Sequence, residues 1–294
     1  MKKFIVLIAI IFATGIFFIN SVSAENTALV SVFRDGIKFS ESVYPYDGGL
    51  FISNFGSENM NPRDDENSGY IIYRKNGVNK KIVEGLHKPT GMEVKDNFLF
   101  ICDETKLLVY NLKNLSEKPR VINFAADDKV VNALTSDGEN LYISITNTGR
   151  IYKLDIRDPK NLKVPQLWLE IPGANGITYG GGEIFIVSIP ADYKTVTAKN
   201  VVYRVKNLKN PVAEKFFDVA GLYDGVALSD DLQTLYVSDW LTSSVTAIDI
   251  KSKKTRVIYE EKGIGPADIA QNGGKIFIPE LVGSRIIEIQ VEEK

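Results

Sequence analysis

Polar residues recur at one position of a repeated two-strand pattern. In each repeat a short strand opens, a turn follows, and a second strand carries an aromatic residue. Counting back ten residues from Phe51, Phe100, Tyr142, Phe185 and Phe277 gives Glu41, Thr90, Asn132, Asn175 and Ala267. Tyr236 needs twelve, because Ser229–Thr234 is a longer turn, and gives Asp224. Glu, Asn, Asn and Asp at four of six equivalent positions could converge as oxygen donors.

Two carboxylates and two amide oxygens favour a hard divalent cation. Glu41 and Asp224 would repel each other and lose solvation if they faced one another without a countercharge. All-oxygen ligands suit Ca²⁺ first, with Mg²⁺ and Mn²⁺ as alternatives. The sequence has one cysteine, Cys102, and one histidine, His87. A zinc site is therefore not expected, and Cys102, in an apolar run, is interpreted as a small buried residue.

Each candidate ligand also has a simpler interpretation. Asn175-Gly176 and Asp224-Gly225 are the commonest kinds of tight-turn pair, and Glu41 alone would be an exposed charge. What favours a shared site is that all of them occupy the same register. The glycines after Asn175 and Asp224 would also let the backbone approach the axis without a side chain in the way.

The spacing of the aromatic residues predicts the fold. Short runs rich in Val, Ile, Tyr and Phe alternate with glycine and proline turns, without a helical period. The aromatics lie 49, 42, 43, 51 and 41 residues apart. Such a period is typical of propeller blades, so we expect an all-β, six-bladed β-propeller with four-stranded antiparallel blades. We expect the strand within 26–34 to close the last blade as its outer strand.

In such a ring the first strand of each blade lines the axis, and the polar positions share one rim. Two long insertions, Asn54–Ser68 and Ile189–Asn200, follow the second strand of their blades and should lie at that rim. Long loops on one rim usually wall a ligand pocket, although solvated surface is the alternative.

The N-terminal residues suggest secretion. Residues 1–24 have a basic start, an apolar run and small residues before a cut after Ala24, as in a signal peptide, which leaves 25–294 as one domain. An uncleaved membrane anchor is the alternative. The prediction is a secreted or cell-envelope protein with no stable membrane insertion after cleavage. The net charge of −2 gives no sign of a nucleic-acid partner. We expect a monomer that binds a small molecule.

The chain resembles the regucalcin/gluconolactonase-like (senescence marker protein) six-bladed propellers over essentially all of 25–294. The resemblance rests on Ser40-Glu41-Ser42, on Ala174-Asn175-Gly176-Ile177, and most specifically on Tyr223-Asp224-Gly225-Val226-Ala227. It implies that Glu41, Asn175 and Asp224 hold the metal, that Asn132 is a fourth ligand or a substrate contact, and that Asp224 doubles as the general base. The family's arginine two residues before Asn132 is replaced by Val130.

These observations predict a metal-dependent hydrolase, a lactonase or esterase, acting on a lactone or ester. Asn132, Thr90 and His87 are candidate substrate contacts, with loop capping as the alternative for His87. The alternative function is a non-enzymatic propeller with a structural metal that binds a protein or glycan, which the change at Val130 favours. A strictosidine-synthase-like reaction is a weaker third idea. The sequence has no Gly-x-Ser-x-Gly motif to place a nucleophile.

Overall fold

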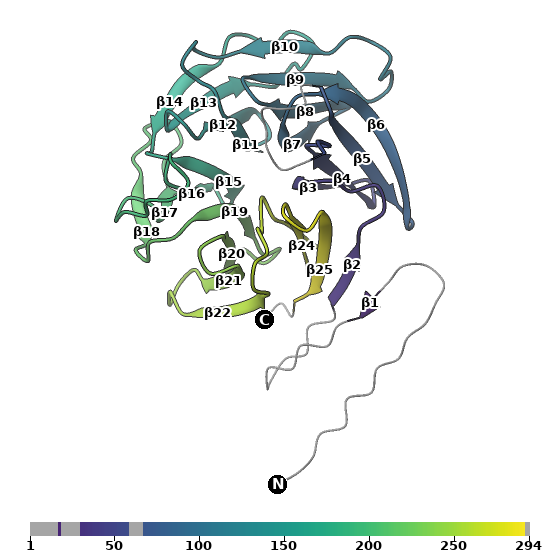
Figure 1. Ribbon diagram of the computed structural model, residues 1–294. Coiled ribbons are helices and arrows are strands. Elements are labelled where there is room, and N and C mark those ends of the chain that lie inside the picture. Colours follow the sequence, from purple (N-terminus) through teal and green to yellow (C-terminus); the bar gives the residue numbers. More distant parts are fainter. Residues whose placement is uncertain (1–16, 19–29, 59–66, 292–294) are drawn as a thin grey trace.

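The computed structural model describes residues 17–18, 30–58 and 67–291, and every regular element in these ranges is a β-strand. The strands form six sheets arranged around a common axis (Figure 1). None of the described residues belongs to a helix that is long and apolar enough to cross a membrane. The predicted leader, 1–24, lies outside the described residues except for Phe17–Phe18, whose backbone pairs with the next strand.

Each of the first five sheets is a blade of four antiparallel strands in chain order from the axis outward. The first two blades contain β3 (Ser40–Tyr46), β4 (Gly49–Asn54), β5 (Gly69–Lys75), β6 (Val78–Leu86), β7 (Pro89–Lys95), β8 (Phe98–Asp103), β9 (Lys106–Asn111) and β10 (Arg120–Asn123). The third and fourth contain β11 (Val131–Ser136), β12 (Asn140–Ile145), β13 (Arg150–Asp155), β14 (Gln166–Glu170), β15 (Ala174–Gly180), β16 (Glu183–Ser188), β17 (Val202–Val205) and β18 (Glu214–Phe217). The fifth contains β19 (Tyr223–Leu228), β20 (Thr234–Asp239), β21 (Ser244–Asp249) and β22 (Thr255–Glu260). The predicted all-β propeller is confirmed.

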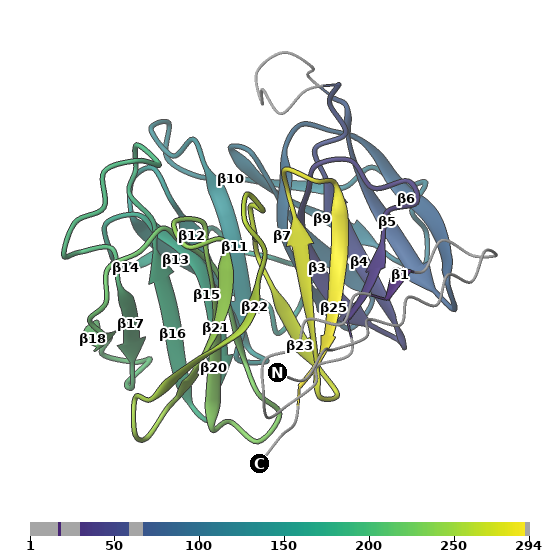
Figure 2. The ribbon, with the colours of Figure 1, turned by 60° about the horizontal axis from the view of Figure 1, so that its bottom comes forward.

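The sixth blade joins the two ends of the chain. From the axis outward its strands are β23 (Ala270–Asn272), β24 (Lys275–Glu280), β25 (Arg285–Gln290), β2 (Val30–Phe33) and β1 (Phe17–Phe18). Val30 pairs with Ile289 and Phe33 with Ile286, so β2 extends the last blade on its outer side, as predicted (Figures 1 and 2). The two-residue strand β1 is a fifth member of this sheet that the sequence did not predict.

The core is divided into six clusters, each between two neighbouring blades. The six anchor aromatics, one per blade, are all buried in the second strand of their blade, where they were expected. Between the sixth and first blades, for example, Phe33 and Phe277 pack against Ile52. Burial of a large apolar side chain contributes about 1.5–3 kcal/mol, so these interfaces supply the main attraction between blades.

The innermost strands contact one another in order around the axis, and the last contacts the first. Glycines make this contact close at three places. A Cβ on Gly176 would lie 2.4 Å from the carbonyl oxygen of Asp224, and one on Gly225 would lie 2.4 Å from the amide nitrogen of Ile269. A Cβ on Gly91 would lie 2.8 Å from the carbonyl oxygen of Asn132 in the third blade. The sequence linked Gly176 and Gly225 to approach toward the axis, and the structure shows that the close approach is to the next blade.

Candidate functional site

The predicted polar register forms one ring at the start of the innermost strands. Glu41, Thr90, Asn132, Asn175 and Asp224 are each the second residue of the first strand in their blade. Ala267 comes before β23 and follows Pro266, which forms an isolated bridge with Glu280. This bridge corresponds to the first residue pair between the first and second strands of the other blades. The count from the aromatic residues therefore selected equivalent positions in all six blades.

A β-bulge places the side chain at this position. In the first blade Ser40 pairs with Asn54 and Val43 with Ile52, so two residues, Glu41 and Ser42, stand opposite Ser53 alone. The same shift occurs in each of the next four blades. A bulge interrupts the regular alternation of side chains and re-aims one of them. The repeated bulge explains why the same register projects from every blade.

Serines in the second strand occupy several of these bulges. Ser53 Oγ accepts a hydrogen bond from the amide of Ser42 at 2.8 Å, and Ser238 Oγ accepts one from Gly225 at 2.7 Å. Ser144 Oγ accepts from Ala133 at 3.1 Å and donates to the Asn175 carbonyl of the next blade at 2.6 Å. These hydroxyls satisfy backbone groups that the bulge leaves without a ladder partner.

The polar residues are also held through their own backbones. Thr90 Oγ1 donates to the Asn132 carbonyl at 2.6 Å, and Ser238 Oγ donates to the Ala267 carbonyl at 2.8 Å. The Asp268 amide donates to the Glu41 carbonyl at 2.9 Å, which joins the sixth blade to the first. Bonds between blades thus fix the ring before any ligand is present.

Each of the four predicted ligands has a buried oxygen without a hydrogen-bond partner. The atoms are Glu41 Oε2, Asn132 Oδ1, Asn175 Oδ1 and Asp224 Oδ1. The residues themselves are between 1% and 8% exposed. Leaving a buried polar group unpaired costs roughly 1–3 kcal/mol, and more for a charged one. An oxygen-coordinated cation would satisfy four such atoms in one register, so the residues fit a metal.

The carboxyl groups of the ring are strongly perturbed. Burial raises the pKa of Glu41 well above its usual value, and the nearby charges of Asp224 and Asp268 raise it further. Burial raises the pKa of Asp224 to about 6, although hydrogen bonds from Trp240 and Asn175 act in the opposite direction. The effect of Asp224 on Glu41 shows that the two carboxylates are electrostatic neighbours, as a shared ion would require.

Asp224 is oriented by an aromatic side chain. Trp240 Nε1 donates to Asp224 Oδ2 at 2.8 Å, while Oδ1 has no protein partner. The indole lies against Gly265, where an added Cβ would come within 2.5 Å of the ring. Trp240 therefore fixes one oxygen of the carboxylate and leaves the other for a ligand.

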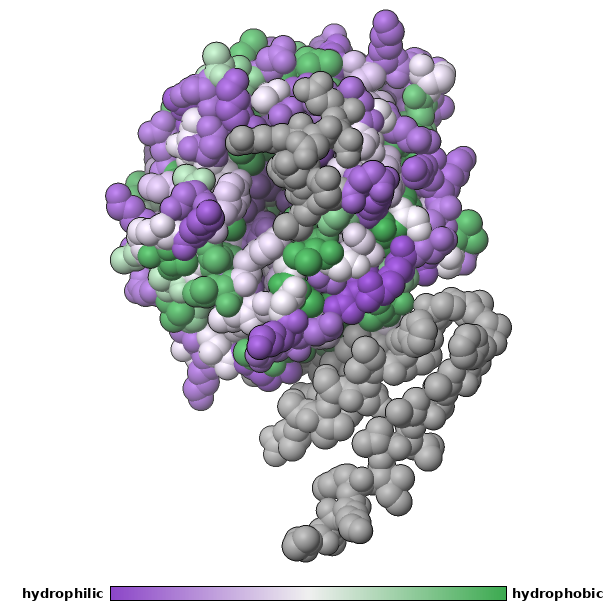
Figure 3. Space-filling model, in the orientation of Figure 1, coloured by the Kyte–Doolittle hydropathy of each residue, from purple (hydrophilic) through white to green (hydrophobic). Residues whose placement is uncertain are grey.

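The ring forms the floor of a cavity of about 590 Å³, named the site cavity here. Besides the four candidate ligands and Thr90, its walls include the apolar or aromatic residues Phe55, Ile189, Tyr193, Leu222, Trp240 and Leu281. Phe55, Ile189 and Tyr193 belong to the two long insertions, so both reach this rim as expected. Figure 3 shows one face of the ring, on which hydrophilic and hydrophobic residues are mixed.

The candidate substrate contacts differ in position. Asn132 and Thr90 line the site cavity, but the hydroxyl of Thr90 donates to the Val131 and Asn132 carbonyls. His87 is not among the lining residues. Its amide donates to Asp103 Oδ1 at 2.9 Å, and its Nδ1 lies 3.3 Å from Glu104 Oε2. These contacts place His87 in the loop before β7, beside the cavity.

Several charged residues near the site were not predicted; besides Asp268 and Lys88, they include Glu104 and Lys129. Asp268 follows the neutral Ala267, and burial raises its pKa to about 7. The ten-residue count stopped one position short of it, and at that next position the first five blades have serine, glycine or alanine. Lys88 is buried in the wall of the site cavity, with its Nζ 5.5 Å from the centre of the Phe55 ring. Its place just before Thr90 was the only sequence signal.

The donor set limits which ion could bind. Within the described ranges, no group of three or more His, Cys, Asp and Glu side chains is placed to hold a metal. An ion in the ring would thus depend on the amide oxygens of Asn132 and Asn175 as much as on the carboxylates. Such a mixed oxygen set suits Ca²⁺ better than a transition metal.

Comparison with known proteins identifies the fold. No family model and no curated protein matches the sequence. Among solved structures, a gluconolactonase from Xanthomonas campestris is similar, with a TM-score of 0.69 and 12% identity, covering 90% of both chains. The two structures share a fold, and the low identity carries no conclusion about activity.

Other structures with the same fold have unrelated roles. Virginiamycin B lyase from Staphylococcus aureus, crystallised as an inactive histidine-to-alanine variant with quinupristin, has a TM-score of 0.60 and 13% identity, covering 90% of this chain and 99% of that one. A chain of a nidogen/laminin complex has a TM-score of 0.58 and 12% identity, covering 82% of this chain and 85% of that one. The fold thus occurs in enzymes and in a protein complex.

Proposed function

We propose that this chain is a metal-dependent hydrolase that opens a lactone or a related ester in the site cavity. The observation that carries the proposal is the set of four buried, unpartnered oxygens on Glu41, Asn132, Asn175 and Asp224. These four side chains would hold a divalent cation, with Ca²⁺ the best match. When bound, such an ion supplies a Lewis acid that polarises an ester carbonyl and increases the acidity of a water molecule.

The residues of the ring would divide the remaining work. Glu41, Asn132 and Asn175 would fix the ion. Asp224 would contribute to binding and accept a proton from the attacking water at Oδ1, while Trp240 keeps Oδ2 in place at 2.8 Å. A general base works best when its pKa is near the working pH, and the pKa of Asp224 is raised toward neutrality by burial.

The walls of the site cavity would select the substrate. Phe55, Tyr193 and Trp240 offer an apolar surface for the body of an ester. Lys88 and Lys129 are its cationic lining residues, and they would attract a carboxylate or another oxygen-rich group on the substrate. Val130 lines the cavity where the resembling family has an arginine. We therefore expect the substrate to be an ester with an apolar body and an acidic group rather than a polyhydroxylated sugar lactone.

Elemental analysis and a substrate panel test the proposal. The purified protein should contain about one equivalent of a hard cation, and it should hydrolyse members of a panel of lactones and aryl esters with Ca²⁺ but not with chelator. Asp224→Ala should lose both metal binding and activity. Asp218→Asn, on the exposed surface after β18, is the control that should retain both. Asp224→Ala with undiminished metal affinity would remove the central role of this residue.

A non-enzymatic binding propeller is the second candidate. The absence of an arginine from the described lining of the site cavity favours it, and the similar nidogen/laminin chain shows that the fold occurs in a protein complex. In this case chelation would lower the melting temperature while no substrate is turned over. A lyase that relies on histidine is disfavoured, because His87, the single histidine of the sequence, does not line the site cavity.

A further inference from the structure

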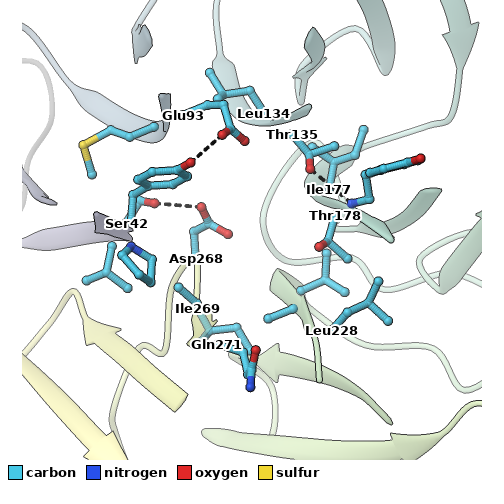
Figure 4. A pocket seen from close by; sticks show the side chains of 18 of the residues that line it. Ser42, Glu93, Leu134, Thr135, Ile177, Thr178, Leu228, Asp268, Ile269 and Gln271 are labelled. Carbon is cyan, nitrogen blue, oxygen red and sulfur yellow. Dashed lines mark hydrogen bonds between the residues drawn. The ribbon is translucent and has the colours of Figure 1, made fainter. Parts of the chain in front are cut away.

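A second cavity lies at the other end of the same six inner strands. It has a volume of about 390 Å³ and is named the far cavity here. The site cavity is lined by the first residues of these strands, whereas the far cavity is lined by later ones such as Tyr44, Glu93, Thr135 and Thr178 (Figure 4). The volume lies within the range of small-molecule sites, roughly 300–1,000 Å³.

Two acidic side chains are held in fixed positions in the far cavity. Tyr44 Oη donates to Glu93 Oε1 at 2.5 Å, and Ser42 Oγ donates to Asp268 Oδ2 at 2.8 Å. Both donors belong to β3, while Glu93 lies on β7 and Asp268 comes just before β23. Figure 4 shows the second oxygen of Asp268 directed away from Ser42, toward the middle of the cavity. The acids are thus positioned before any ligand arrives.

The far cavity has a strong charge imbalance. Its described lining includes Glu93, Asp230 and Asp268, and no lysine, arginine or histidine. A carboxylate in a partly desolvated cavity attracts a cation more strongly than one in water does. Burial raises the pKa of Glu93 to about 7, which is consistent with a carboxyl group that has no basic neighbour. A ligand that complements this cavity would carry a positive charge.

The remaining walls indicate an organic cation in place of a metal ion. Leu134, Ile177, Leu228 and Met92 add apolar side chains to the lining, and Tyr44 adds an aromatic one. The described residues offer no group of three or more acidic, histidine or cysteine ligands for a metal. An aromatic face and a carboxylate together are a common setting for an alkylammonium group.

We propose that the far cavity is a second binding site, which takes a small primary amine with its ammonium group between Glu93 and Asp268 and its short apolar chain against Leu134, Ile177 and Leu228. The far cavity and the site cavity have different lining residues, although Asp268 also lies beside Glu41, and the proposal does not depend on the proposed hydrolase activity. It gives the molecule one ligand class at each end of its axis.

Calorimetry with three matched probes tests the ligand class. Titration of the purified protein in EDTA with n-butylamine, n-butanol and butyrate varies the charge while the chain length stays nearly constant. We expect one equivalent of butylamine to bind at least about ten-fold more tightly than butanol, and butyrate not to bind, because a charge-assisted hydrogen bond contributes roughly 1.5–3 kcal/mol. Equal binding of amine and alcohol would overturn the proposal.

Variants test the location. Glu93→Gln and Asp268→Asn keep the shape of the side chain and should each weaken butylamine binding by about ten-fold or more. Thr178→Phe should block the far cavity by filling it while leaving both acids in place. Asp218→Asn, on the exposed surface after β18, is the control and should bind butylamine as the wild type does. Binding that survives Glu93→Gln and Thr178→Phe but is lost in Asp224→Asn would place the amine in the site cavity and refute the proposal.

Discussion

At the scale of single residues, the four unpartnered oxygens make the ring costly without a ligand. For Glu41, burial and two neighbouring carboxylates raise the pKa well above the usual value. Replacing one of two facing acids by an amide should therefore help the metal-free protein and harm the metal-bound one. This opposition distinguishes a ligand from a structural acid, whose loss would be harmful in both states.

We predict that Glu41→Gln stabilises the chelated protein at pH 7.5, because the raised pKa of Glu41 makes its ionised form unfavourable in the folded state. The same change should abolish most of the stabilisation that Ca²⁺ gives the wild type. Denaturant unfolding with EDTA and with Ca²⁺ measures both effects. Glu84→Gln, an exposed acid on β6, is the control and should behave as the wild type does. Equal calcium stabilisation in Glu41→Gln would contradict the assignment.

A prediction about the pH dependence of stability follows from Glu93, which is not part of the ring. Burial raises its pKa from 4.5 to about 7, and the hydrogen bond from Tyr44 only partly opposes this. The folded protein therefore holds the proton more tightly than the unfolded chain between about pH 4.5 and 7. Its contribution is neutral below this window, becomes unfavourable as the pH rises through it, and is fully unfavourable above pH 7.

Glu93→Gln should accordingly match the wild type near pH 4.5 and exceed it in stability by up to about 3 kcal/mol above pH 7. Denaturant midpoints of the two proteins at pH 4.5, 6 and 7.5, all in EDTA, give the difference. A stability difference that stays constant across this range would show that the Glu93 carboxyl is not perturbed in the folded state.

At the scale of elements, the repeated bulge is the device that turns strands into a ring of ligands. Ser144 both fills the bulge of the third blade and donates to the carbonyl of Asn175 in the fourth. We predict that Ser144→Ala lowers the free energy of unfolding by about 1–3 kcal/mol, because it leaves buried backbone groups unpaired. It should also weaken calcium binding, because Asn175 loses a contact that positions it.

Thermal and denaturant unfolding, followed by calcium titration, checks both parts of this prediction. Ser116→Ala removes an exposed hydroxyl and serves as the control. A variant that loses stability but keeps its calcium affinity would limit Ser144 to a structural role.

The same elements show what the sequence could and could not predict. The period of the aromatics found every blade, and the ten-residue count found the ring, because both depend on local strand and turn lengths. The bulge could not be predicted, since Ser53 opposite two residues looks like any strand serine until the pairing is known. Asp268 was missed for the same reason, because the sixth blade places its charge one residue later than the count. The residues that line the far cavity come from all six blades, so the sequence alone could not bring them together.

At the scale of the whole molecule, stability depends on the seam where the chain closes on itself. Val32 and Phe33 of β2 are buried in the two clusters that flank the sixth blade. Ser284 Oγ accepts from the Phe39 amide at 2.9 Å, and Ser40 Oγ donates to the Arg285 carbonyl at 3.2 Å, which ties the first blade to the sixth. Without β2, the apolar edge of β25 would face solvent.

We predict that a chain starting at residue 34 is less stable than one starting at residue 25 by at least about 3 kcal/mol, the contribution of two buried apolar side chains. Guanidinium unfolding and limited proteolysis of the two chains make the comparison. Calcium should bind to both if both fold, because the ring residues follow residue 34. Identical denaturation midpoints would show that β2 is not needed for closure.

The pairing of β2 with β25 also sets an order of events during synthesis. Val30 is synthesised long before Ile289, its partner in the sixth blade. A nascent chain can therefore form the first five blades in turn, but β2 stays unpaired until the strands of the sixth blade are made. Because contacts between residues far apart in the sequence form slowly, the pairing of β2 with β25 is expected to be the last and slowest step in folding the propeller.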